Sequence, residues 1–431
     1  MKKILFLLII LSTILLGKDI KTNELLKNLN NPEWVIVDTR DSNEYNGWNL
    51  SNLKINGHIK GATDLSANWL KEKYLSSNNK EILKQRVLEK GITPEKNIVL
   101  YGKSTEMKDV EKYLKENGVK NLYFYDFEKN KDYDRLPFET YENYEILVPA
   151  TWVKNAMDKN EVKVFEVSWG SIKNAAVYLA GHIPGAPHIN TDSIEPPPKW
   201  MLNTDENLIK FAQEMGISKN AAVVLYGDDV MASYRLAIIL KYLGVKDVRV
   251  LNGGLEAWKD AGYKTEMGIV KPTPIKDFGS KTPLNKSLIV NENEAKQVLK
   301  DNKNSKLLVD IRSYNERIGK ESGYSYMHRK GRIPGSVWGK SGTKSTTLED
   351  YRNIDNTMRN GYEIISMWSG LGINPNKELT FFCGSGWRAA EVLFYSQVMG
   401  LKNNALYSNG WIEWSENSSN PIETGIDLSK I

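Results

Sequence analysis

The sequence has one cysteine, Cys383, and four histidines among its 431 residues. A single cysteine excludes an internal disulfide, a CxxC redox pair and a multi-cysteine zinc or iron–sulfur site. Four histidines leave little room for a histidine-rich metal centre. The charge is nearly balanced, with 58 Lys and Arg against 53 Asp and Glu, which argues against nucleic acid as a partner.

The N-terminus also lacks a long hydrophobic run. Lys2 and Lys3 precede 13 residues, Ile4 to Leu16, interrupted only by a serine and a threonine, whereas a membrane-spanning helix needs about 20. A basic start, a short apolar stretch and the small Gly17 are typical of a secretory signal. We therefore predict a signal peptide at residues 1–17 and a periplasmic or otherwise exported protein without stable membrane insertion. The alternative is an uncleaved N-terminal anchor.

The rest of the sequence repeats one unit three times. An acid-ended strand, a glycine-rich turn and a second strand that runs into a small-residue loop and a helix recur in the same order. The acids are Asp38, Glu166 and Asp310, the turns begin at Gly57, Gly181 and Gly331, and the loop glycines are Gly102, Gly227 and Gly384. Gly118, Gly244 and Gly400 stand where a left-handed residue would end each helix. Alternating strands and helices predict parallel α/β domains.

Three domains follow from the repeat, and they lie at residues 18–140, 146–266 and 284–427. Polar stretches that contain proline, Glu128–Ile146 and Lys264–Asn285, are suited to linkers between them. The third unit has extra residues around 341–360, which we expect to form either a lid or a contact with the second unit.

Cys383 lies at the end of an apolar strand, Leu379–Phe382, just before a helix that is predicted to begin near Trp387. Ligands bind at the carboxyl ends of strands in open α/β sheets. Gly384 and Gly386 allow a tight curl in which successive N–H groups point inward, and the helix N-terminus adds its positive end. Such a cradle stabilises a thiolate or a persulfide anion without a histidine base. The alternative is a buried, inert thiol.

These motifs together resemble the rhodanese (sulfurtransferase) family. The features that carry the resemblance are the acid-ended strand, the Gly181-His-Ile-Pro-Gly-Ala186 turn, the cysteine loop and the Leu251-Asn-Gly-Gly-Leu-Glu-Ala-Trp258 ending. The resemblance implies three tandem rhodanese-like domains, each a small doubly wound α/β domain with a central parallel sheet. Tyr101 and Tyr226 align with Cys383 in the first two units. Because a phenol cannot carry a persulfide, domains 1 and 2 are expected to be inactive.

The expected site is the loop that Cys383 opens. Cys383 is the predicted nucleophile, and the predicted substrate-binding residues are Gly384, Ser385, Gly386, Trp387 and Arg388. Arg388 is expected to clamp an oxyanion such as thiosulfate, with pairing to a neighbouring acid as the alternative. Trp387 is expected either to pack or to wall the pocket. Asp310 and Arg312 are expected to brace loops.

The resemblance implies transfer of a sulfane sulfur from a donor such as thiosulfate, through a Cys383 persulfide, to cyanide or a thiol. This reaction implies neither a metal nor an organic cofactor. The alternatives are a 3-mercaptopyruvate sulfurtransferase and a sulfur carrier or docking protein without turnover, for which a sulfur-relay protein would be the partner. A phosphatase or arsenate reductase is disfavoured, because Arg388 follows Cys383 after four intervening residues, and Cdc25-type phosphatases have five.

Overall fold

The computed structural model describes residues 17–301 and 303–426. The predicted signal peptide therefore lies, apart from Gly17, outside the described residues. Within the described part of the chain, no helix has the length and apolar character needed to cross a membrane. The residues form two compact units: the chain up to Asp41 together with His58–Phe138, and Ser42–Gly57 together with the chain from Glu139 onward.

The first unit contains a parallel five-stranded sheet in the order β1-β6-β5-β2-β4. Its strands are β1 (Lys18–Asp19), β2 (Trp34–Asp38), β4 (Thr63–Asp64), β5 (Asn97–Gly102) and β6 (Leu122–Asp126). Its helices are α1 (Thr22–Asn28), α3 (Ser77–Glu89) and α4 (Ser104–Glu116), with the short strand β3 (His58–Ile59). Strand β7 (Phe138–Glu139) follows, and helix α2 (Ser42–Asn46) belongs to the second unit.

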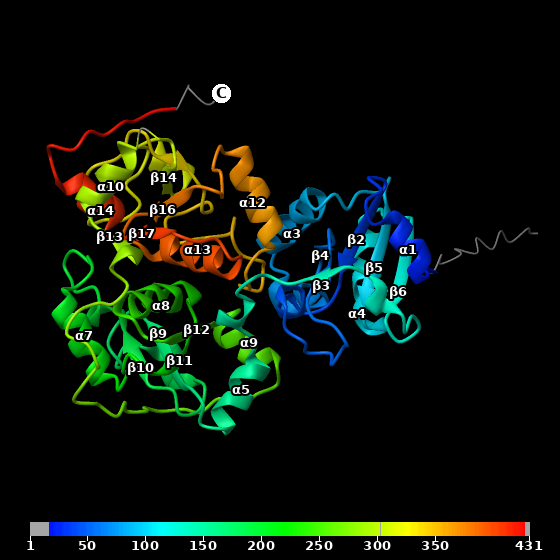
Figure 1. The fold of residues 1–431 in the computed structure, drawn as a ribbon, viewed down its shortest axis with the longest axis horizontal. Helices are drawn as coiled ribbons and strands as arrows, with labels where there is room; N and C mark the ends of the chain where they lie inside the picture. The colour runs from blue at the N-terminus through cyan, green and yellow to red at the C-terminus, as the bar shows by residue number, and fades with distance from the viewer. Residues whose placement is uncertain (1–16, 302, 427–431) are drawn as a thin grey trace, which may run out of the picture. The chain divides into compact units, whose positions relative to one another are not determined.

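The second unit holds two further parallel sheets, ordered β10-β9-β11-β12-β8 and β13-β17-β16-β14-β15 (Figure 1). The strands of domain 2 are β8 (Leu147–Val148), β9 (Lys163–Ser168), β10 (His188–Asn190), β11 (Ala222–Tyr226) and β12 (Asp247–Leu251). Those of domain 3 are β13 (Ile289–Val290), β14 (Lys306–Asp310), β15 (Val337–Trp338), β16 (Glu378–Phe382) and β17 (Ala405–Tyr407). In all three sheets the fourth strand lies between the second and the fifth, which confirms the predicted repeat of one parallel α/β domain.

Helices cover the sheets of both domains in the second unit. Those of domain 2 are α5 (Ala150–Asp158), α6 (Ala176–Ala180), α7 (Asp205–Glu214), α8 (Val230–Leu243) and α9 (Gly254–Asp260). Those of domain 3 are α10 (Glu292–Leu299), α11 (Tyr314–Arg317), α12 (Gly361–Gly370), α13 (Trp387–Val398) and α14 (Gly410–Glu416). Gly118, Gly244 and Gly400 have φ of +89°, +95° and +85° after α4, α8 and α13, which confirms the predicted helix ends.

The register of the sheets corrects the alignment of the three loops by one residue. Asp38 lies opposite Tyr101, Glu166 opposite Tyr226, and Asp310 opposite Phe382. Phe382 is therefore the counterpart of the two tyrosines, and Cys383 is the counterpart of Gly102 and Gly227. The alignment of Tyr101 and Tyr226 with Cys383 is wrong, because a fully buried parallel strand has no polar alternation that would fix its register.

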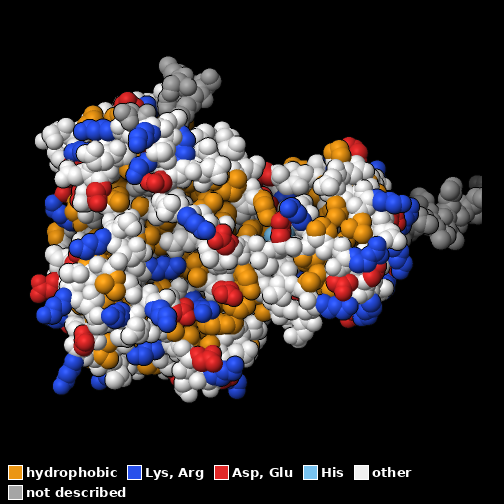
Figure 2. Space-filling view, in the orientation of Figure 1, with side chains coloured by type: hydrophobic (Ala, Val, Ile, Leu, Met, Phe, Trp, Pro, Cys, Tyr) orange, Lys and Arg blue, Asp and Glu red, His pale blue; other side chains and the backbone are white. Residues whose placement is uncertain are grey.

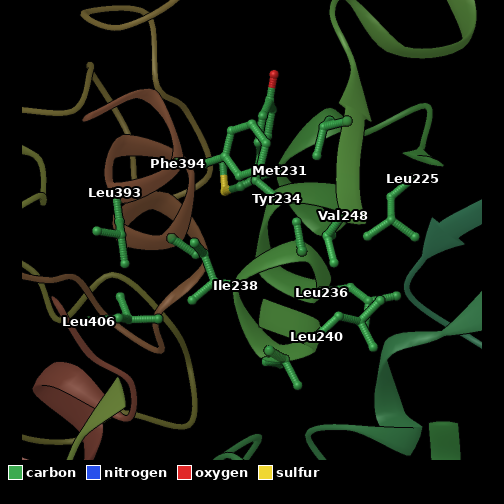
Figure 3. Packing of buried hydrophobic residues seen from close by; sticks show 14 of the residues in the cluster. Leu225, Met231, Tyr234, Leu236, Ile238, Leu240, Val248, Leu393, Phe394 and Leu406 are labelled. Atoms are coloured by element: carbon green, nitrogen blue, oxygen red, sulfur yellow. The ribbon is translucent and has the colours of Figure 1, made fainter. Parts of the chain in front are cut away.

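Domains 2 and 3 share one hydrophobic core, which lies between α8 and α13. Figure 3 shows Tyr234 and Ile238 of α8 facing Phe394 and Leu393 of α13, and the Tyr234 and Phe394 ring centroids are 5.3 Å apart. Both helices begin beside the loops that follow β11 and β16. This packing therefore brings a face of domain 2 to the cysteine loop of domain 3.

The residues around 341–360 contact domain 2. This is one of the two alternatives predicted for them, the other being a lid. The backbone N–H of Met358 donates to Oδ1 of Asn252 at 2.9 Å. The linker after domain 2 also packs on that domain, since Lys219 N–H donates to the Phe278 carbonyl at 2.8 Å. On the face shown in Figure 2, basic and acidic side chains are interspersed, in keeping with the nearly balanced charge.

Candidate active site

Cys383 follows β16 directly and lies at the start of the loop that leads into α13. Its side chain is buried, with 1% of its surface exposed. The backbone N–H of Gly386 donates to the Cys383 Sγ at 3.2 Å. Because Gly386 is the residue that precedes the first turn of α13, the sulfur also lies near the positive end of that helix. The loop therefore offers a hydrogen bond and a favourable electrostatic environment to an anionic sulfur.

Two features shape this loop: the left-handed backbone of Gly386 and the hydrogen bonds from the first turn of α14. Gly386 has φ of +98°, and a Cβ there would lie 2.4 Å from the Ser408 carbonyl oxygen. The N–H groups of Trp411 and Ile412 donate to the carbonyls of Cys383 and Gly384 at 2.9 and 3.1 Å. The first turn of α14 thus binds the Cys383 and Gly384 carbonyls and fixes the course of the loop, in which the Gly386 amide donates to the sulfur.

Arg388 lies in the first turn of α13 and is completely buried. Its Nη1 and Nη2 donate to the two carboxylate oxygens of Glu316, each at 2.8 Å, and Nη1 also contacts Ser341 Oγ at 3.3 Å. Burial raises the pKa of the Glu316 carboxyl, but the charge and hydrogen bonds of Arg388 outweigh it and hold that pKa below its usual range. The guanidinium is therefore engaged by a neighbouring acid. Only its Nε lacks a hydrogen-bond partner, so an anion-clamping role stays a prediction.

Two tyrosines cover the loop. The Tyr324 ring lies against Gly384, where a Cβ would come within 2.7 Å of it, and the Tyr324 hydroxyl donates to the Ser345 carbonyl at 2.7 Å. The Tyr326 ring stacks on Tyr324 with centroids 5.4 Å apart, and its phenol is hydrogen-bonded to Ser385. Burial raises the pKa of Tyr326 to about 12 and that of Tyr324 further still. Both phenols are therefore protonated hydrogen-bonding groups at neutral pH.

A cleft of about 510 Å³ lies next to Tyr324 on the side of the extra segment. Its lining includes Tyr324, Ser345, Lys330 and Lys344. Cys383 itself does not line this cleft. The Tyr324 ring therefore separates the cleft from the cysteine loop, and two cationic side chains lie at the cleft wall.

Domain 2 contributes a buried ion pair to the same loop. The Trp387 indole N–H donates to Oε2 of Glu195 at 2.6 Å. Oε1 of that carboxylate accepts from Nε and Nη2 of Arg235 at 2.8 and 2.6 Å. Burial raises the pKa of Glu195, although Arg235 and the indole oppose that rise. Trp387 thus does more than pack, because it links the cysteine loop to a charge pair of the neighbouring domain.

Of the six predicted site residues, the structure places Cys383 to Gly386 in the loop after β16 and Trp387 and Arg388 in the first turn of α13. Asp310 and Arg312 form a buried bidentate pair at 2.8 Å, and Arg312 also donates to the Gly331 carbonyl, so the predicted bracing role is confirmed. The sequence reasoning missed Glu195, Arg235, Glu316, Tyr324 and Tyr326. Glu316 alone has a local signal, because Ser313-x-x-Glu316 forms a capping box at α11.

Comparison with known proteins places this geometry in a family. The Rhodanese-like domain family matches residues 21–127, 149–261 and 292–417. The chain is 37% identical over 402 residues to thiosulfate sulfurtransferase YnjE of Escherichia coli (strain K12), with 90% of this chain and 88% of the relative covered. It is 28% identical over 301 residues to sulfur carrier protein TtuD of Thermus thermophilus, which covers 66% of this chain and 99% of the relative.

Solved structures of EanB are similar over nearly the whole chain. The wild-type structure has a TM-score of 0.87 and 37% sequence identity, and the match covers 95% of this chain and 98% of that chain. Other EanB structures contain a cysteine persulfide with ergothioneine, or contain hercynine. The chain belongs to the rhodanese family, and the class of enzyme that its repeats and relatives define is the sulfurtransferases.

Proposed function

We propose that the protein accepts a sulfane sulfur from a small donor such as thiosulfate and passes it to a thiophilic acceptor, cyanide or a thiol. The observation that carries the proposal is the Gly386 N–H, which donates to the Cys383 Sγ at the start of α13. The 37% identity to a thiosulfate sulfurtransferase over 90% of this chain supports the choice of donor.

The reaction proceeds by two displacements at sulfur. The Cys383 thiolate attacks the outer sulfur of thiosulfate, the S–S bond of the donor breaks, and sulfite leaves with the bonding electron pair. Cys383 then carries a persulfide anion, whose charge the Gly386 amide and the helix N-terminus stabilise. The acceptor attacks the outer sulfur, and the Cys383 thiolate leaves. No electrons enter or leave the system.

The experiment is a loading and release assay on the full chain. The protein is incubated with thiosulfate or with 3-mercaptopyruvate, its mass is measured, and thiocyanate is followed after cyanide is added. We expect a mass gain of one sulfur atom and stoichiometric thiocyanate, both lost in C383S. Loading without release would instead identify a sulfur carrier. A mass gain that persists in C383S would refute the proposed nucleophile.

A carbon acceptor is the second candidate, and Tyr324 favours it. One EanB structure with ergothioneine has its tyrosine 353 replaced by phenylalanine and carries a persulfide on its cysteine 412. These two EanB positions are 59 residues apart (412 − 353). Tyr324 precedes Cys383 by the same number (383 − 324). An EanB threonine two residues after its cysteine corresponds to Ser385. Ergothioneine differs from hercynine by one sulfur atom on carbon, so one persulfide sulfur per hercynine balances the reaction.

Hercynine added to the sulfur-loaded protein tests this candidate directly. Formation of ergothioneine, detected by mass, would establish a carbon acceptor. In that case Y324F should lower ergothioneine formation, because the Tyr324 phenol is a protonated group beside the loop, and should leave thiocyanate release nearly unchanged. Thiocyanate without ergothioneine would exclude the candidate.

The proposed place of action is outside the cytoplasm, on the basis of residues 1–17. The full chain and a chain that begins at residue 18 can be produced in a Gram-negative host and fractionated. We expect only the full chain in the periplasmic fraction. Recovery of both chains in the cytoplasm would refute export.

A further inference from the structure

A segment of domain 2 that has no cysteine of its own lies against the cysteine loop. The backbone N–H of Leu202 donates to Asn409 Oδ1 at 2.9 Å, next to the first turn of α14. The Trp200 ring lies over Tyr326, with centroids 4.8 Å apart. Glu195 begins this segment and accepts the Trp387 indole N–H. The loop is thus contacted from the neighbouring domain at several points.

Arg235 of α8 contacts Gly386 of the same loop and also Ser408. It is completely buried, and its Nη2 donates to Ser408 Oγ at 2.7 Å in addition to Glu195. A Cβ on Gly386 would lie 2.8 Å from Arg235 Nη1 and 3.0 Å from Cζ, so the guanidinium packs directly against Gly386. Nη1 has no hydrogen-bond partner. A buried cationic donor therefore touches the residue whose amide binds the Cys383 sulfur.

We propose that Glu195 and Arg235 of domain 2 are the positioning pair of the cysteine loop in domain 3. Arg235 packs against Gly386, and Glu195 holds the indole of Trp387, so two successive loop residues are fixed from outside their own domain. The fixed Gly386 amide then points at the sulfur in the thiolate and in the persulfide. The site around Cys383 is accordingly built by two domains. The proposed function enters this inference only in the identity of the sulfur species that the loop holds.

Burying Glu195 and Arg235 has a desolvation free energy that an apolar contact between the domains would not have. Two buried charges contribute little net stability compared with apolar residues of similar volume. Arg235 also keeps Nη1 unpaired, which is unfavourable for a buried donor. A pair retained only for stability would have no need of contact with Gly386 and Trp387. Preorganisation of a site that binds an anion is the function that such a pair can serve.

The test compares three variants of the full chain. E195Q/R235M removes both charges at once, so that no unpaired charge is left buried. W387F removes the indole N–H and replaces the indole with the smaller phenyl ring, while the Glu195–Arg235 pair stays in place. K241M is the matched control, because Lys241 Nζ joins the same two helices through Gln397 Oε1 at 2.8 Å, away from the loop. Each variant is first checked for folding by circular dichroism and thermal unfolding.

Two readouts are then measured. The first is the single-turnover rate of sulfur loading against thiosulfate concentration, and the second is hydrogen–deuterium exchange of the peptide that contains residues 383–390 in the unloaded protein. We expect the maximal loading rate of E195Q/R235M to fall on the order of tenfold, with W387F in between, because a small misplacement of a catalytic group is costly. The half-saturating donor concentration should stay constant, and exchange in the loop peptide should rise. K241M should change neither quantity.

A folded E195Q/R235M chain with unchanged loading and unchanged exchange would overturn the proposal. If the unaltered chain takes sulfur from no donor, the proposed function fails, and the exchange measurement still decides about the positioning pair. If E195Q/R235M does not fold, W387F carries the test, and its unchanged loading and exchange would also overturn the proposal.

Discussion

The guanidinium of Arg388 and the carboxylate of Glu316 form a bidentate pair from which water is excluded, with both N–O distances at 2.8 Å. The two side chains have no exposed surface. Arg388 is one turn into the helix that follows Cys383, and Glu316 caps α11 on the other side of the loop. The pair thus ties α13 to the segment that carries the covering tyrosines.

We expect R388M to destabilise the protein by about 3–5 kcal/mol, because it leaves the Glu316 charge buried without a partner. R388M/E316Q should recover most of that loss, since it removes both charges. Urea unfolding of the two variants and the unaltered chain gives the comparison. If R388M keeps full stability and only raises the half-saturating thiosulfate concentration, Arg388 is an anion clamp and not a structural partner.

We expect G386A to abolish sulfur loading, since a Cβ would collide with the Ser408 carbonyl and with Arg235. G372A is the matched control in the same domain. Gly372 has φ of +77°, and a Cβ there would meet no atom within 4 Å. Both variants carry backbone strain of about 1 kcal/mol, but only G386A should fail to gain sulfur mass. Loading by G386A would show that the loop does not need its present shape.

Removal of the Tyr324 ring should expose the thiol. In Y324A we expect Cys383 to react with iodoacetamide on the order of tenfold faster, because the ring that packs on Gly384 is gone. Y314A is a suitable control, since Tyr314 is 44% exposed and its ring lies against Trp338, with centroids 5.3 Å apart, and not against the cysteine loop. Equal alkylation rates in Y324A and the unaltered chain would mean that the thiol is reached by another route.

Neither domain 1 nor domain 2 should gain activity through a cysteine in place of its tyrosine. In the C383S background we expect Y226C to take up no sulfur, since the counterpart of Cys383 is Gly227 and not Tyr226. The variant should also lose stability, on the order of 3 kcal/mol, because the Tyr226 hydroxyl accepts the Ile183 N–H at 2.9 Å. The mass of the Y226C/C383S chain after thiosulfate treatment shows whether it has taken up sulfur. A gain of one sulfur atom would contradict the register argument.

Lys241 predicts a pH dependence of stability. Burial lowers its pKa to about 8, against 10.5 in the unfolded chain. Between these two values the unfolded state binds more protons, so the free energy of unfolding contributed by Lys241 rises with pH, by up to about 3 kcal/mol. K241M should lack this increment and be more stable than the unaltered chain at pH 7. Urea unfolding of both chains at pH 7, 8.5 and 10 measures the difference, and parallel curves would refute the prediction.

The sequence was sufficient for the features that depend on local chemistry. Glycine after each long helix, an apolar strand before Cys383 and a helix that begins at Trp387 all have local signals, and the structure confirms them. The one-residue error at Tyr226 arose in a strand, β11, whose last four residues are buried and show no polar alternation, because such a pattern does not encode register.

Contacts between distant parts of the chain could not be predicted in the same way. Glu195 and Arg235 meet the loop only because α8 packs on α13, and nothing near either residue in the sequence indicates that packing. For Arg388 the sequence predicts only an acid as partner, without naming it, and Glu316 lies 72 residues away. Patterns in one sequence predict where helices and strands begin and end, whereas the identity of the groups that surround Cys383 depends on tertiary packing.

The hydrogen bonds from Trp411 and Ile412 to the carbonyls of the cysteine loop have a consequence for the order of assembly. During synthesis Cys383 emerges before the residues that bind its loop, so the nascent chain carries the thiol before these hydrogen bonds can form. The shape of the cysteine loop is then a property of the finished fold, acquired when α14 docks. A premature stop just before α14 would therefore leave Cys383 in the chain and remove the hydrogen bonds that hold its loop.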